Sequence, residues 1–298
     1  MLIQADTLRP FSILPKTLGS ARTPFGVFQM NGIMNLDFWK MKNRGAIFSA
    51  SEGQTSSVDM GRKRKVVEHV CLLKAKEDVS DEKEKDMMDY LYTSQYQMGG
   101  IVAVSIGRIS DRNLDNYTHA FYMRFQTKEA LAKFYNNTFY LGVLKDHVMP
   151  YCHGLIHLDY ESEVDDDILA IFRKGEEFNF GVEFVIFIEF VESALGRPVE
   201  DALASLAKLT MEFPSLIVQA TQGSNFNVTN KEYTHGVVIR FRSLEAFEIF
   251  MSSSEYKDMW RSKFQPITRN ILSNHFSVDP VGDKHAGSYI SESFQMHC

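Results

Sequence analysis

The sequence has little cysteine, no long apolar run and no excess of positive charge. Its three cysteines, Cys71, Cys152 and Cys298, lie far apart and form no CxxC pair, which predicts a reducing compartment and no disulfide framework. The longest apolar run is about seven residues, 184–190, and Glu189 interrupts it, whereas a bilayer span needs about 20. The net charge of −6 argues against a general nucleic-acid binder. We therefore expect no membrane association and no nucleic-acid partner.

Several common catalytic and metal-binding signatures are also missing. The chain has no HExxH, no glycine-rich phosphate loop and no GxSxG. His153 and His157 lie four residues apart in a predicted strand, but no third ligand stands near them, so we interpret them as ordinary strand residues. The basic run 61–65 is interpreted as a solvated segment. No metal site is predicted from side chains.

Residues 1–61 differ in composition from the rest of the chain. Within 1–58 there are six Lys or Arg residues and only three Asp or Glu, with many hydroxyl side chains and no sustained period. This composition is typical of an organellar transit peptide. Because arginine is not strongly enriched, a chloroplast is favoured over a mitochondrion. The alternative is a disordered arm on a cytoplasmic protein.

The remainder of the chain contains an internal repeat. Tyr-Thr-His recurs at 117–119 and 233–235, and Arg-Phe recurs at 124–125 and 240–241, both at an offset of 116. Such self-similarity at a constant offset indicates two copies of one domain. We place the domains at 62–162 and 178–282, with a linker at 163–177 and a tail at 283–298.

Each copy shows the same predicted order of strand, helix, strand, strand, helices and strand. Ser80 and Pro198 are predicted to open the first helix of each copy. This order is typical of a ferredoxin-like fold, whose open sheet needs a cover that a second copy can supply. We therefore predict an α+β protein, two α/β-barrel repeats closing as an intramolecular pseudo-dimer, with helices outside and pockets within. The expected strands are 66–74, 101–106, 117–125 and 154–160, then 182–190, 216–222, 233–241 and 275–281; the later helices are 127–135, 138–149, 243–252 and 254–270.

The third strand of each copy alternates in character. Positions 117, 119, 121, 123 and 125 read Tyr, His, Phe, Met and Phe, and their counterparts read Tyr, His, Val, Ile and Phe. Residues two apart in a strand share a face. The face that bears His119 and His235 is therefore predicted to be the apolar, packed one.

Several short pieces of the sequence match the pattern of one known family: Val67–Lys74, Ile106-Gly107, Tyr117–His119 with Phe125, Pro150, Leu158-Asp159-Tyr160 and, in the second copy, Val278-Asp279. In these pieces each repeat resembles the stress-responsive dimeric A/B barrel (Dabb) family of plants and bacteria. The resemblance implies a barrel closed by two domains, here within one monomer. A tandem chain behind a predicted transit peptide is similar to the plant members, which implies a role in stress response or defence.

Some family members cyclise linear polyketides with a Tyr-x-x-His-Pro-x-His pattern after the third strand. At the tyrosine and second histidine positions of that pattern, this chain has Phe134 and Tyr140 in the first copy. The second copy has Phe250 and Tyr256 there. A phenol is a poor base at neutral pH, so the resemblance does not carry the cyclase mechanism to this chain. We lean towards a protein that is not an enzyme.

The remaining polar groups suggest binding pockets for an apolar or aromatic small molecule, with the imidazoles orienting it. The alternative is that the strand histidines are structural, bonded to the threonine or tyrosine beside them. No cofactor is expected, although the family resemblance implies that Mg²⁺ could be held at the backbone oxygens of Met98–Ile101. The candidate pocket residues are His69, His119, Phe134 and Tyr140 in the first copy and Phe184, His235, Phe250 and Tyr256 in the second.

These observations lead to three functional hypotheses. The first is a non-catalytic stress-response protein that binds a small molecule or protects the cell. The alternative is a polyketide-cyclase-like or lyase enzyme on a β-keto substrate, with His119 or His235 as the base. A third hypothesis is an assembly or scaffold protein that works through exposed helices.

Overall fold

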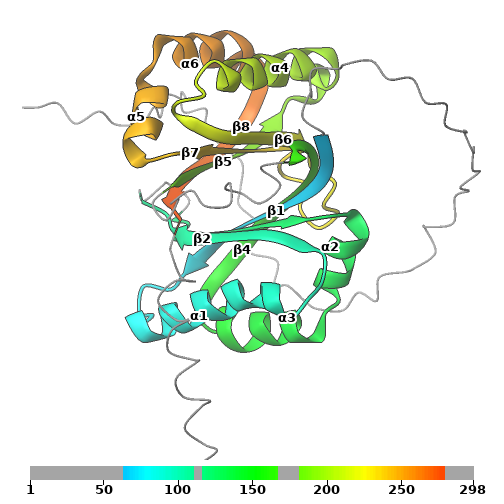
Figure 1. Cartoon of the computed structure of the whole chain (residues 1–298), viewed down its shortest axis with the longest axis vertical. Helices are drawn as coiled ribbons and strands as arrows, with labels where there is room; N and C mark the ends of the chain where they lie inside the picture. Colours follow the sequence, from blue (N-terminus) through cyan, green and yellow to red (C-terminus); the bar gives the residue numbers. More distant parts are fainter. Residues whose placement is uncertain (1–62, 111–115, 167–180, 279–298) are drawn as a thin grey trace, which may run out of the picture. The chain divides into compact units, whose positions relative to one another are not determined.

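The computed structural model describes residues 63–110, 116–166 and 181–278. It contains two four-stranded antiparallel sheets, one in each repeat (Figure 1). In both sheets the second strand of the repeat pairs with the third, the third with the first and the first with the fourth. The predicted α+β fold with two ferredoxin-like repeats is therefore confirmed. The predicted leader at 1–61, the tail at 283–298 and most of the linker lie outside the described residues.

The order of elements is the same in both repeats, with short 3-10 or π turns between the main elements. In the first repeat the elements are β1 (Lys63–Ala75), α1 (Asp81–Thr93), η2 (Ser94–Tyr96), β2 (Ile101–Arg108), β3 (His119–Phe125), α2 (Lys128–Tyr135), α3 (Thr138–Val143), η3 (Leu144–Val148) and β4 (Cys152–Asp165). In the second repeat they are β5 (Val182–Phe190), η5 (Glu192–Ala194), α4 (Arg197–Met211), β6 (Ile217–Ser224), β7 (His235–Phe241), α5 (Leu244–Ser252), α6 (Ser254–Met259), η6 (Trp260–Phe264), η7 (Gln265–Ile267) and β8 (Thr268–Ser277).

Local capping explains where the helices begin. The Ser80 side chain accepts a hydrogen bond from the Lys83 amide at the start of α1, as the sequence predicts. Thr127 and Ser243 cap α2 and α5 in the same way. Pro198 lies in the first turn of α4, where its missing amide hydrogen costs nothing.

The ends of β4 and β8 differ from the prediction. Strand β4 continues to Asp165, so the predicted linker 163–177 begins too early. Strand β8 begins at Thr268, inside the predicted helix 254–270 and well before the predicted strand 275–281. It pairs with β5 along Val182–Phe190 and lies at the edge of its sheet. Because an edge strand tolerates polar side chains, its sequence lacks the apolar run that marks a central strand.

Three buried clusters define the layers. One lies between the first sheet and its helices and includes Met87, Phe121 and Phe134. An equivalent cluster lies between the second sheet and its helices. The third mixes strands of both sheets, such as Tyr122 with Val238. The two sheets therefore pack against each other and the helices cover their outer faces.

None of the helices in the described part of the chain is both long and apolar enough to span a membrane.

Both faces of β3 and β7 are buried, including the face that carries arginine. Arg124 donates from Nη2 to Glu68 Oε1 at 2.7 Å and to Gln219 Oε1 at 2.6 Å. Arg240 donates from Nε to Glu183 Oε1 at 2.9 Å. Both ion pairs are fully buried between the sheets. The layer between the sheets thus contains paired charges among apolar side chains.

Candidate functional site

The predicted pocket residues lie on the outer, helix-covered faces of the sheets rather than inside the barrel. His69 on β1 has its ring 5.8 Å from the ring of Phe134 on α2. Phe134 lies 3.9 Å from the ring of Tyr140 on α3. The structure therefore brings three of the four candidates in the first repeat together, on the opposite side of the sheet from the predicted interior.

His119 does not join this group. It pairs with Leu73, four residues along β1 from His69, which corresponds to about 13 Å in a strand. Its Nδ1 lies 2.8 Å from Thr118 Oγ1 and its Nε2 lies 2.5 Å from Glu84 Oε1. Burial lowers the pKa of His119, although Glu84 acts in the opposite direction. Both ring nitrogens of His119 therefore have hydrogen-bond partners.

His235 in the second repeat is engaged in the same manner. Its Nδ1 lies 3.0 Å from Thr234 Oγ1 and its Nε2 lies 3.0 Å from Ser224 Oγ. The interpretation of the two strand histidines as bonded to a neighbouring threonine is confirmed. Burial lowers the pKa of His235 to about 4.

The burial of His235 predicts that the folded protein loses stability in acid. Because its pKa is about 4 in the folded protein against 6.5 when unperturbed, only the unfolded chain gains the proton as pH falls through this window. Stability is therefore unaffected above pH 6.5 and is lost progressively between about pH 6.5 and pH 4. We expect this histidine to contribute about 2 kcal/mol of that loss, after allowance for its partial exposure. Urea unfolding near neutral pH and at about pH 4.5 should show a smaller acid loss for His235→Asn than for wild type; equal losses would contradict the assignment.

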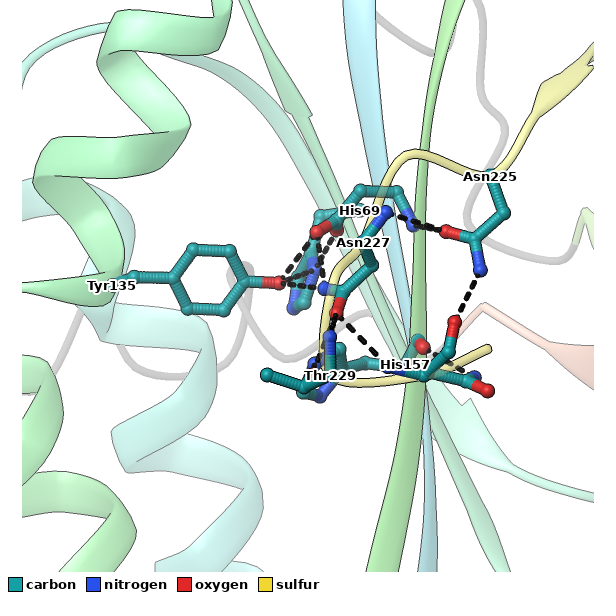
Figure 2. Close-up of polar contacts among 8 residues, drawn as sticks. His69, Tyr135, His157, Asn225, Asn227 and Thr229 are labelled. Carbon is teal, nitrogen blue, oxygen red and sulfur yellow. Dashed lines mark hydrogen bonds and ion pairs between the residues drawn. The ribbon is translucent and has the colours of Figure 1, made fainter. Parts of the chain in front are cut away.

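The polar centre of the first repeat is an Asp–His pair with a tyrosine. The β1–β4 register places Asp159 opposite His69, and Asp159 Oδ1 lies 2.7 Å from His69 Nδ1. Tyr135 at the end of α2 donates to Asp159 Oδ2 at 2.8 Å (Figure 2). Burial raises the pKa of Asp159, but the contacts with His69 and Tyr135 outweigh it and hold that pKa below its usual value. The carboxylate is therefore ionised.

This arrangement leaves one nitrogen of His69 available. The imidazole is buried, and its Nε2 has no hydrogen-bond partner among the described residues. Because Asp159 accepts the Nδ1 hydrogen, a neutral His69 presents the Nε2 lone pair. The rings of Phe121, Phe134 and Tyr135 surround the imidazole at centroid distances of 5.5 to 6.5 Å. Chemically, the site is a hydrogen-bond acceptor or base in aromatic surroundings.

His157 lies beside this site on β4. Its ring is 5.7 Å from that of His69, and its Nε2 lies 2.9 Å from Thr229 Oγ1. Burial and the neighbouring His69 lower its pKa to about 4, so His157 is neutral at physiological pH. His153 on the same strand is exposed. No group of three or more His, Cys, Asp or Glu able to hold an ion occurs in the described part of the chain.

The second repeat does not reproduce the polar centre. Phe184 and His275 occupy the cross-strand positions of His69 and Asp159. Phe184 lies 5.3 Å from Phe247, which stacks on His275 at 4.4 Å. Phe250 lies 5.0 Å from Tyr256, whose pKa burial raises above its usual value. The two copies thus share a fold, but the second has Phe184 and His275 where the first has the His69–Asp159 pair.

Three residues of the site were not among the pocket residues predicted from the sequence. They are Tyr135, Asp159 and His157. Asp159 was visible as a carboxylate inside an apolar strand, in the piece Leu158-Asp159-Tyr160 that resembles the family. Tyr135 directly follows the candidate Phe134. Neither signal identifies a partner, because the pairing with His69 depends on strand register.

The magnesium position expected at Met98–Ile101 stays a prediction. The Gly100 carbonyl oxygen accepts a hydrogen bond from the Gln126 amide at 2.9 Å. This oxygen therefore already has a partner within the protein. Backbone oxygens without a carboxylate hold Mg²⁺ weakly, since the ion favours carboxylate and water oxygens. We assign no step to a metal ion.

Comparisons with known proteins agree with this fold. Residues 67–162 match the family described as Stress responsive A/B Barrel Domain. A stress-response A/B barrel domain-containing protein of Arabidopsis thaliana is 22% identical over 216 residues, covering 72% of this chain and 79% of the relative. A putative monooxygenase from Fusobacterium nucleatum superposes with a TM-score of 0.54 at 12% identity, covering 72% of this chain and 93% of that chain. An anthrone oxidase-like protein superposes with a TM-score of 0.51 at 10% identity, covering 72% and 91%. At such identities the two structures show a shared fold.

Proposed function

We propose that this chain is a small-molecule-binding stress-response protein, because residues 67–162 match the stress-responsive A/B barrel domain family and a second copy of the fold follows them. The proposed binding site is centred on His69 in the first repeat. The observation that carries the proposal is the buried Nε2 of His69, which has no partner among the described residues. A buried polar atom without a partner is costly, and a ligand donor would remove that cost.

The surroundings of His69 define the class of ligand. Aromatic side chains on β3, α2 and α3 favour an apolar or aromatic body, which gains from ring contacts. The Nε2 acceptor favours a hydroxyl or another donor on that body. The second repeat, with Phe184 at the matching position, serves as a structural partner. Since no member of the cyclase pattern is retained, binding is favoured over cyclisation.

The first test uses 4-nitrophenol, a small aromatic molecule with an acidic hydroxyl, as the probe. His69→Phe gives the first repeat the residue that the second repeat has at the same position. We expect this variant to bind the probe at least about tenfold more weakly, because the loss of one hydrogen bond to a buried acceptor is worth about 1.4 kcal/mol or more. Absorbance titration of the full chain measures the affinity, since hydrogen bonding to a base shifts the spectrum of the probe.

His119→Asn is the matched control, because both nitrogens of His119 are already bonded. It should bind the probe as the wild type does. Equal binding by wild type and His69→Phe, with both proteins folded, would contradict the proposal. A discrete extra mass in a native mass spectrum of the full chain, lost in His69→Phe, would identify the natural ligand by its mass.

A second candidate function is an acid–base enzyme, and the His69–Asp159 contact favours it. An imidazole oriented by a carboxylate can remove a proton next to a carbonyl, while the carboxylate stabilises the imidazolium that forms. His119 and His235 are less suitable as bases, since each would have to break an existing hydrogen bond. Turnover of a β-keto substrate that is lost in His69→Phe and kept in His119→Asn would favour the enzyme over the binding protein.

A further inference from the structure

A loop of the second repeat lies against the site of the first. The segment between β6 and β7 runs along β4, and Figure 2 shows it crossing the cluster as a yellow ribbon. The Phe226 amide donates to the Asp159 carbonyl at 2.9 Å, and the Asp159 amide donates to Asn225 Oδ1 at 3.3 Å. Asn230 Nδ2 donates to the His157 carbonyl at 2.7 Å. The loop is therefore bonded directly to the strand that carries Asp159.

Asn227 at the centre of this loop has a defined orientation. Its Oδ1 accepts hydrogen bonds from the Thr229 amide at 2.9 Å and from Thr229 Oγ1 at 2.6 Å. These donors identify Oδ1 as the oxygen, which leaves the Nδ2 group to face the site. Nδ2 donates to Asp159 Oδ2 at 2.5 Å and to the Tyr135 hydroxyl at 3.1 Å.

We infer that Asn227 is a positioning residue, supplied by the second repeat, that holds the carboxylate of Asp159 so that His69 keeps its hydrogen on Nδ1 and its lone pair on Nε2. Tyr135 and Asn227 both donate to Oδ2, which leaves Oδ1 for the imidazole. Hydrogen bonds to the ionised form lower the pKa of Asp159. This inference rests on the proposed function of His69, but its test requires no ligand.

The contact of this loop with the other repeat has a counterpart on the other side of the molecule. On the other side, the Ser110 amide donates to the His275 carbonyl at 3.1 Å, and Ile109 forms a bridge with Phe276. That contact lies beside the cross-strand pair of Phe184 and His275, which occupies the place of His69 and Asp159. The second repeat thus supplies Asn227 to a polar cluster that is built on the sheet of the first repeat.

The test measures the protonation of Asp159 and the tautomer of His69 by NMR in the full chain. In Asn227→Ala, we expect the pKa of Asp159 to rise by about one unit, because a charge-assisted donor is lost. The ¹⁵N shifts should also show an increased share of the His69 tautomer with hydrogen on Nε2. Asn227→Asp should raise the pKa of Asp159 further, since it places a like charge against the carboxylate.

Asn270→Ala is the matched control. Asn270 belongs to the same repeat and donates to the Tyr233 hydroxyl at 3.4 Å, as Asn227 does to Tyr135. It should leave both NMR readouts unchanged. If Asn227→Ala and Asn270→Ala have the same Asp159 pKa and the same His69 tautomer, the inference is overturned, even if probe binding at His69 is real. Loss of probe binding with both NMR readouts shifted would support the inference and the proposed function together.

Discussion

Arg124→Met is expected to lower the free energy of unfolding by about 3–5 kcal/mol, because it leaves a carboxylate buried without its cation. Arg124 and Glu68 have no exposed surface, and Arg124 donates to Glu68 at 2.7 Å. The same guanidinium donates to Gln219 of the second sheet, so the variant also removes a bond between the repeats. Equilibrium unfolding in urea, followed by circular dichroism, measures the change.

Arg269→Met provides the control for this experiment. Arg269 donates to Glu189 at 2.7 Å, yet its side chain is 59% exposed. Exposed ion pairs contribute about 0–1 kcal/mol, so the control should change little. The double variant Glu68→Gln with Arg124→Met should recover part of the loss, since it removes the uncompensated charge. Similar small losses for Arg124→Met and Arg269→Met would show that the burial of the pair has no energetic consequence.

Gly223→Ala is expected to destabilise the protein by about 3 kcal/mol, the upper part of the range for overpacking. A Cβ atom at Gly223 would overlap the carbonyl oxygen of Glu161 and lie 2.9 Å from the Tyr160 side chain. Both belong to β4 of the other repeat, and a backbone oxygen in a paired strand has little room to move. The two sheets would therefore have to separate locally. Gly107 meets the Ser277 carbonyl in the same way on the other side.

Gly142→Ala is expected to stabilise the protein, in contrast to Gly223→Ala. A Cβ at Gly142 would meet nothing within 4 Å, and the residue lies inside α3. Alanine should stabilise this helix by about 0.5–1 kcal/mol, because it has less conformational entropy to lose than glycine. Thermal and urea unfolding of both variants measure the difference. A Gly223→Ala protein as stable as wild type would mean that the sheets do not approach as closely as described.

The internal repeat makes the paired glycines and arginines visible in the sequence, but it does not show what they contact. The identities at Gly107 and Gly223, and at Arg124 and Arg240, are visible in the sequence and indicate a duplicated domain. Their reason is not visible, because each residue meets its main constraint in the other repeat or on a distant strand. The prediction that the face with His119 is the packed one is confirmed, but the opposite face is equally buried. A strand covered on both sides can hold a charge where an ion partner is supplied.

In the candidate site, too, the sequence identified some residues but not their surroundings. His69, Phe134 and Tyr140 could be selected because their residue types and their place in a repeated pattern suggest a pocket. The prediction that they lie inside the barrel was wrong, because they lie on the helix-covered face of the sheet. The sequence pattern alone does not say which face of a strand buried on both sides meets the second sheet. The satisfaction of His119 and His235 by a neighbouring threonine was accessible from sequence, because those partners are adjacent in the chain.

By itself the sequence determined the duplication, the order of strands and helices, the capping residues and the apolar faces. Each of these follows from local periodicity or from self-similarity along the chain. Only the tertiary structure decided that Asp159 meets His69 across 90 positions and that Asn227 reaches Asp159 across 68. Such contacts arise from strand register and from the packing of one repeat on the other. No local pattern encodes them, because the partners come together only when the two sheets close.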